Sequence, residues 1–173
     1  FDDRIYFKLA RSLNKIGEVY IINPSISQLN TEEDIKFIQK KAKSGSDLKW
    51  IVEELRKIKP SIIHVTEPFL LKPAAYYKNI ELAKIIYDPA EDWISMYEDF
   101  SRKIWPVPRI LSYYIKKYEN FYISQVDHLI SSDKWLYEYY KKKGPCSLIY
   151  NYPNSDLFNI NLKSIVKIPY SCV

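Results

Sequence analysis

The order of apolar and polar positions along the chain predicts short buried strands that alternate with helices. Runs rich in isoleucine, valine and tyrosine, bounded by proline, glycine or aspartate, are expected to form the strands. These predicted strands span residues 18–23, 61–66, 83–88, 127–132 and 146–151. A further strand-like run covers residues 163–170.

Segments with apolar residues three or four positions apart lie between these strands and are expected to form helices. The predicted helices span residues 3–16, 31–43, 47–58, 68–81, 108–124 and 133–143. The helix over 108–124 is strongly amphipathic, and Glu119 is expected on its solvent side. Its expected inner face carries Ile110, Leu111, Tyr114, Ile115, Tyr118, Phe121 and Tyr122.

Strands that are apolar on both faces, each followed by a helix, are typical of a parallel sheet covered on both sides. The predicted fold class is therefore α/β, a Rossmann-like parallel sheet with helices on both faces. Such a sheet normally begins with a strand, whereas this chain begins with a predicted helix, so we expect a first strand ahead of residue 1. The run 163–170 is an alternative occupant of that position, or the start of a following domain.

Composition limits the possible functions. The 173 residues fit one domain, and a net charge of +5 suits phosphates, nucleotides or anionic lipid headgroups without selecting among them. With 3 glycines in the chain there is no dinucleotide or Walker fingerprint, and no nucleic-acid-binding motif is present, so nucleic acid is not an expected partner. Cys146 and Cys172 have no metal-ligand spacing, which predicts free thiols in a reducing compartment and no metal.

Acidic side chains follow two of the predicted strands. Glu67 comes after the first of these strands, close to His64, and Asp88 and Glu91 come after the next. Because the carboxyl ends of parallel strands meet at one edge of the sheet, these side chains are expected to lie around a shared ligand site there.

Each of these residues also has a structural interpretation. Asp88 could cap a helix that has Pro89 at its first position, and His64 could be a buried structural histidine. Arg4 could bind an anion at a helix start, or pair with Asp2 or Asp3 on the surface.

Five segments occur in an order and spacing that match a known pattern. They are FDDRI at 1–5, HVTEP at 64–68, IIYDPAE at 85–91, VDHLISS at 126–132 and LIYNYPNSDLF at 148–158. Together they resemble motifs of the N-terminal, acceptor-side lobe of family 4 glycosyltransferases, which have the GT-B fold. The resemblance covers residues 1–158 and implies one lobe of a GT-B architecture, with 159–173 as a linker or the start of a further strand.

The resemblance implies a retaining glycosyltransferase that uses a nucleotide sugar in polysaccharide or glycoconjugate synthesis. Arg4, His64, Glu67, Asp88 and Glu91 would then bind substrate. The only small molecule implied besides the acceptor is the nucleotide-sugar donor, held mainly by a C-terminal lobe that this sequence lacks, so the chain alone is expected to be inactive.

The implied partners are a sugar or lipid-linked acceptor and the donor lobe of the same protein. The implied location is the cytoplasm, with peripheral contact at the inner membrane face through the loop 105–108, unless that loop packs against its own domain. The sequence departs from the family at Ala90, where a histidine usually contacts the donor sugar. That departure favours an alternative, a degenerate and non-catalytic lobe that binds carbohydrate or a partner protein; a sugar-nucleotide epimerase lobe is a more remote one.

Overall fold

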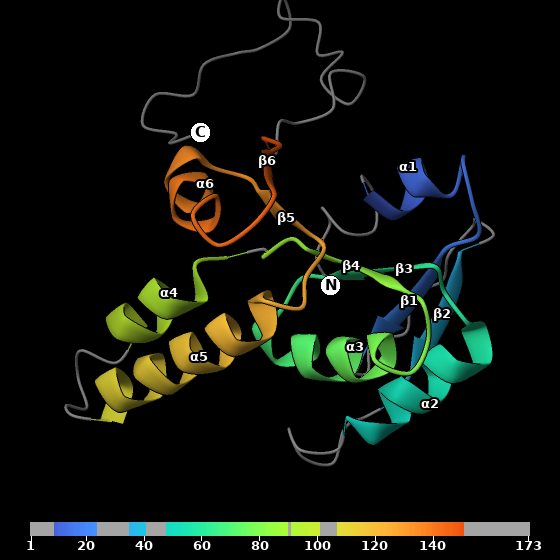
Figure 1. Cartoon of the computed structure of the whole chain (residues 1–173), viewed down its shortest axis with the longest axis horizontal. Helices are drawn as coiled ribbons and strands as arrows, with labels where there is room; N and C mark the ends of the chain where they lie inside the picture. Colours follow the sequence, from blue (N-terminus) through green and yellow to red (C-terminus); the bar gives the residue numbers. More distant parts are fainter. Residues whose placement is uncertain (1–8, 24–34, 41–47, 90, 101–106, 151–173) are drawn as a thin grey trace, which may run out of the picture.

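A computed structural model describes residues 9–23, 35–40, 48–89, 91–100 and 107–150. For residues 97–100 and 107–109 it describes the backbone alone. Its centre is a parallel sheet with the strand order β3–β4–β5–β6. The strands are β3 Ile62–Val65, β4 Lys84–Tyr87, β5 His128–Ser131 and β6 Cys146–Leu148. The predicted fold class is confirmed: the chain is α/β, with a Rossmann-like, all-parallel sheet flanked by helices (Figure 1).

The register of the sheet places one row of apolar side chains on a common face. Val65 of β3 lies opposite Tyr87 of β4, and Tyr87 lies opposite Leu129 of β5. Because facing residues in neighbouring strands point to the same side of a sheet, these three side chains form the centre of the core. All three are at most 3% exposed.

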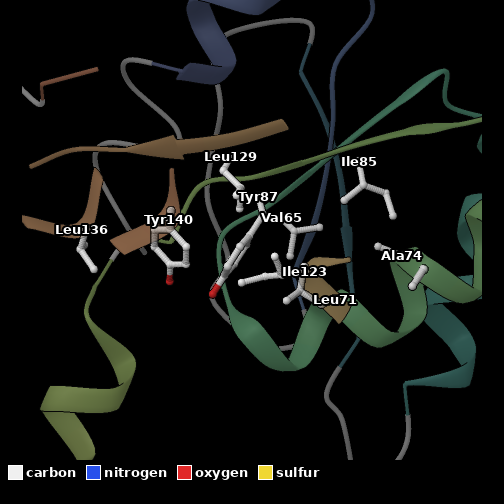
Figure 2. Packing of buried hydrophobic residues seen from close by; sticks show 10 residues of the cluster. Val65, Leu71, Ala74, Ile85, Tyr87, Ile123, Leu129, Leu136 and Tyr140 are labelled. Carbon is white, nitrogen blue, oxygen red and sulfur yellow. The ribbon is translucent and has the colours of Figure 1, made fainter. Parts of the chain in front are cut away.

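Helices bring the remaining core residues to this face. Leu71, Ala74 and Ala75 come from α3 (Leu71–Lys78), Ile123 from α5 (Val107–Ile123), and Leu136 and Tyr140 from α6 (Lys134–Tyr140). Figure 2 shows Leu71, Ile123 and Val65 meeting beside the ring of Tyr87. A short 3-10 turn, η2 (Pro68–Leu70), joins β3 to α3, and α4 (Trp93–Phe100) follows β4.

A second, two-stranded parallel sheet lies next to the first. It pairs β1 (Tyr20–Asn23) with β2 (Lys36–Gln39). Ile22 and Ile38 pack against the cluster around Trp50 of α2 (Lys49–Ile58), and Ile21 and Phe37 pack on the opposite side against Ala10. Ala10 immediately precedes α1 (Arg11–Leu13), so helical segments cover both faces of this pair (Figure 1).

The helix predicted over 31–43 is wrong where the structure describes that segment, because residues 36–39 form β2. Phe37 and Ile38 are adjacent in sequence and pack toward opposite faces, which a strand allows and a helix does not. The glutamates and lysines around them favoured a helix, but burial on both faces decides the conformation of this segment.

Within the described part of the chain, β1 and β3 each pair along one edge only, with β2 and β4 respectively. The strand expected ahead of residue 1 and the strand-like run 163–170 both lie outside the described residues. The first strand, the boundary near residue 158 and the role of 159–173 therefore stay predictions.

Candidate functional site

The carboxyl ends of β3 and β4 bring two of the predicted site residues into contact. The Nε2 atom of His64 lies 3.2 Å from Oδ2 of Asp88. The backbone N–H of Asp88 donates to the carbonyl of Val65 at 2.8 Å, which continues the β3–β4 ladder past the end of β4 and fixes the start of the following loop. Asp88 is 7% exposed and the His64 side chain 17% exposed, so the pair is mostly shielded from water.

Glu67 lies at the same edge, two residues beyond the end of β3. Its backbone is extended, and its carbonyl accepts the N–H of Leu70 at 3.1 Å in the turn η2. The side chain is half-buried, and burial raises the pKa of the Glu67 carboxyl above its ordinary value. A carboxyl group in this setting binds a proton, or a hydroxyl donor, more readily than one in water does.

Of the other predicted site residues that the structure describes, Glu91 is not part of this contact. The Glu91 side chain is exposed, whereas Asp88 is buried. Arg4 and Ala90 lie outside the described residues. The structure therefore supports a site built on His64 and Asp88, with Glu67 beside them.

The alternative role of Asp88 as a helix cap is wrong. Helix α4 begins at Trp93, and its first turn is capped by Asp92, whose Oδ1 accepts the N–H of Ser95 at 3.1 Å. Asp88 contacts His64 as an acceptor-only group beside an imidazole that can donate or accept. Together the two side chains offer a ligand both kinds of hydrogen-bonding group.

A buried carboxylate that the sequence did not predict lies directly behind this edge. Glu119 of α5 is 1% exposed, and its Oε1 accepts from the hydroxyls of Tyr87 and Tyr140, each at 2.8 Å. Figure 2 shows both tyrosine rings with their hydroxyl ends turned away from Leu129. The expectation that Glu119 lies on the solvent side is wrong, because two tyrosine donors replace its hydration.

The environment of Glu119 affects the ionisation of its neighbours. Burial, and after it the charge of Glu119, raise the pKa of Tyr87 and of Tyr140 well above the ordinary range. Burial also raises the pKa of Tyr139 to about 12, with Glu119 as the next cause. The second oxygen of Glu119 and the Tyr139 hydroxyl are both buried and have no hydrogen-bond partner among the described residues.

The polar cluster at the opposite, amino-terminal edge is structural. Asp127 precedes β5 and accepts from Lys78 at 2.5 Å, from Lys84 at 2.9 Å and from the N–H of Ile85 at 2.9 Å. Burial opposes the ionised form, but these three donors hold the pKa of Asp127 well below its usual range. Every one of the donors comes from α3 or β4, so Asp127 fixes the start of β5 to its neighbours and has its acceptor capacity occupied.

The predicted inner face of α5 is correct in part. Ile115, Tyr118 and Tyr122 are half-buried, and Tyr122 packs against the core. Four residues expected on the inner face are instead exposed: Ile110, Leu111, Tyr114 and Phe121. The residues that are buried include Ser112 and Glu119, together with Ile123. The apolar pattern predicts an amphipathic helix, and it locates the face that meets the rest of the domain only in part.

In the ranges that the structure describes, no group of three or more His, Cys, Asp or Glu side chains could hold a metal ion. None of the helices in the same ranges is long and apolar enough to cross a bilayer. No known protein family, curated protein or solved structure matches the chain. What the fold and the site define is thus a Rossmann-like α/β unit with a histidine–carboxylate pair at the carboxyl edge of its sheet.

Proposed function

We propose that this chain is the acceptor-binding lobe of a retaining, nucleotide-sugar-dependent glycosyltransferase. The observation that supports this most strongly is the His64–Asp88 contact across two adjacent parallel strands, at the edge where open α/β sheets bind their ligands. The motifs that resemble family 4 glycosyltransferases include both residues of this contact.

The pair suits the hydroxyls of a sugar. Each hydroxyl both donates and accepts a hydrogen bond. Asp88 accepts only, and when His64 donates through Nε2 to Asp88 its Nδ1 atom is the acceptor of the ring. Because the pair is largely shielded from water, hydrogen bonds made there are stronger than on an open surface.

In the proposed reaction, an acceptor hydroxyl oxygen bonds to the anomeric carbon of the donor as the bond from that carbon to the phosphate oxygen breaks. The hydroxyl proton passes to that phosphate oxygen. His64 and Asp88 hold the acceptor oxygen in place, and Glu67 contacts a neighbouring hydroxyl. Positioning of this kind lowers the barrier by removing the entropy cost of bringing the two reactants together. Stabilising the leaving phosphate falls to donors on the second lobe.

Ala90 favours a second candidate function, a carbohydrate-binding lobe without turnover. The same edge would bind sugar hydroxyls in that case, and no glycosyl group would be transferred. Both functions require carbohydrate binding, and only the first forms a product.

A donor-panel assay on the natural full-length protein tests the proposal. The protein is incubated with nucleotide sugars and simple glycoside acceptors, and products are identified by mass. We expect an acceptor that is heavier by one glycosyl residue, and we expect Asp88→Asn and His64→Ala to lower kcat/KM at least about tenfold. As a control we use His128→Gln: His128 is level with His64 in the sheet but lies two strands away, on β5, where its Nε2 is 2.9 Å from the Ser147 hydroxyl oxygen.

Sugar binding without any product would favour the non-catalytic lobe. If a complete donor panel gives no sugar binding and no product, both functions are contradicted.

A further inference from the structure

An exposed tryptophan lies in the first turn of α6. Trp135 is 63% exposed, whereas Trp50 is buried and Trp93 is half-buried. Covering an aromatic ring of this size removes a large apolar area from water. A ligand that packs on the Trp135 ring therefore gains free energy from the contact.

Two neighbours on α6 fix the orientation of this ring. The Trp135 ring is parallel to the Tyr139 ring to within 4°, and the two ring centroids are 6.4 Å apart. The Nζ atom of Lys143 lies 3.8 Å from the centroid of the Tyr139 ring. Trp135 comes one helical turn before Tyr139 and Lys143 one turn after it, so the three side chains form a stack along the helix. The outer face of the Trp135 ring is the end of this stack, on the side where α6 begins.

Hydrogen bonds hold the first turn of α6 at the carboxyl end of β5. Oδ1 of Asp133 accepts the N–H of Leu136 at 2.8 Å, and the buried hydroxyl of Ser131 donates to the carbonyl of Asp133 at 2.8 Å. Leu136 belongs to the same core cluster as Tyr87 (Figure 2). Trp135 is thus carried by a rigid element, which suits a residue that orients a ligand.

The outer face of Trp135 lies at the same edge of the sheet as the candidate site. Strands β4 and β5 are parallel neighbours, so the loop after β4 and the turn that starts α6 leave the sheet side by side. Burial and, after it, the charges of Glu119 and Asp92 raise the pKa of Tyr139. Tyr139 therefore lies close to the loop after β4, which carries Asp88 as well as Asp92. Strands β3 and β5 are two strand spacings apart, which is about 10 Å.

We propose that the outer face of Trp135 binds one pyranose ring of the acceptor, while a hydroxyl of the adjoining ring contacts His64 and Asp88. A pyranose with equatorial hydroxyls has an apolar face of axial C–H groups with partial positive charge, and the face of an aromatic ring carries partial negative charge. Two linked rings span the separation between β3 and β5.

This inference rests on the proposed function and narrows its substrate class. The acceptor is a saccharide of at least two residues, and the ring that packs on Trp135 has the equatorial hydroxyls of a glucose-like sugar. A single sugar would make only the contacts with His64 and Asp88.

Titration of the natural full-length protein with matched saccharides tests this inference. The probes are methyl glycosides of glucose, galactose, mannose and N-acetylglucosamine, each as the monosaccharide and as its homodisaccharide. Covering and stacking on an aromatic ring should give at least one disaccharide an affinity about 5- to 20-fold higher than that of its monosaccharide. Trp135→Ala should remove this difference, and Trp135→Phe should keep part of it. Protons on one face of the bound disaccharide should shift upfield in its NMR spectrum, and Trp135→Ala should abolish that shift.

The matched control is Tyr76→Ala, which removes an aromatic side chain of similar exposure, 57%, from the last turn of α3 at the opposite edge of the sheet. This variant should bind saccharides like the unmodified protein, and thermal unfolding should show that every variant folds. Asp88→Asn should weaken binding of monosaccharides and disaccharides alike.

The outcomes separate this inference from the proposed function. If both Trp135 variants keep the full disaccharide advantage while Asp88→Asn weakens binding, the inference is wrong and the proposed function stands. If Trp135→Ala removes the advantage and the donor panel gives no product, the subsite stands on a non-catalytic lobe. If no saccharide of the panel binds, the inference and the proposed function are both wrong.

Discussion

The hydroxyl of Tyr87 donates to the buried carboxylate of Glu119 at 2.8 Å, and this bond joins the central strand β4 to helix α5. Tyr140 of α6 donates to the same oxygen, so three elements meet at one carboxylate. The next residue after Tyr87 is Asp88, which contacts His64. The position of the candidate site thus depends on a polar contact inside the core as well as on the strands.

Removing one of these donors should destabilise the domain. Tyr87→Phe leaves the Glu119 carboxylate with one tyrosine hydroxyl, and a hydrogen bond to a charged group contributes about 1.5–3 kcal/mol to the free energy of unfolding. Urea denaturation measures the loss. The matched control is Tyr139→Phe, because the Tyr139 hydroxyl has no hydrogen-bond partner among the described residues, and its removal should cost less than about 0.5 kcal/mol. Equal losses in the two variants would count against the contact as a stabilising one.

The same cluster predicts a loss of stability at high pH. The pKa of Tyr87 and Tyr140 is raised in the folded state, so folding favours their neutral form. Their contribution is complete below the unfolded-state pKa of about 10 and is lost as the pH rises above it, because the unfolded chain then releases protons that the folded chain retains. Absorbance at 295 nm should show these phenols ionising only together with unfolding. Titration of all 16 tyrosines near pH 10 with the fold intact would contradict this.

The amino-terminal edge predicts a loss of stability in acid. The pKa of Asp127 is lowered in the folded state, so its contribution is complete above the unfolded-state pKa of about 4 and declines as the pH falls below it. Asp127→Asn should flatten the fall in urea midpoint between about pH 5 and pH 2. Lys78→Met should reproduce much of this effect, and the double variant should add little to either single change, since both break one contact. Additive effects would show that the two residues act separately.

The end of α2 predicts a stabilising substitution. Lys59 has φ 53°, in the left-handed region, where its N–H donates to the carbonyl of Leu55 at 2.8 Å and closes the helix ahead of Pro60. Lys59→Gly should raise the free energy of unfolding by about 1 kcal/mol, because glycine adopts this conformation without a steric cost. Lys59→Val should lower it, since a β-branched side chain is the least suited to a positive φ. A lower thermal midpoint for the glycine variant would contradict this account of the helix end.

The sequence predicted the main sheet because its strands are apolar on both faces, and that pattern has few alternatives. The strands β3, β4 and β5 fall within the predicted spans, and so do helices α3 and α6. Helix α4 (Trp93–Phe100), between β4 and α5, was not predicted. Segment 36–39 was missed because polar residues surround its two apolar ones, and only the contacts of Phe37 and Ile38 on opposite faces distinguish a strand from a helix.

The candidate site was predicted in part. Placing His64 and Asp88 at one sheet edge followed from the parallel fold, since strand ends of a parallel sheet converge. Glu119 was missed because periodicity places a glutamate on the polar side of a helix, and its burial depends on Tyr87 and Tyr140, which are distant in sequence. One signal was available: a single acidic residue in a helix otherwise rich in tyrosine and lysine.

The central claim is that sugar hydroxyls bind at the carboxyl ends of β3 and β4. Chemical-shift mapping of the isotope-labelled protein, titrated with methyl glycosides and with nucleotide sugars, tests it most directly. The account predicts that the amide and side-chain signals of His64, Glu67 and Asp88 shift together on binding, and that those of Asp127 at the opposite edge do not. Shifts centred on Asp127 and its lysines, with His64 and Asp88 unchanged, would contradict it.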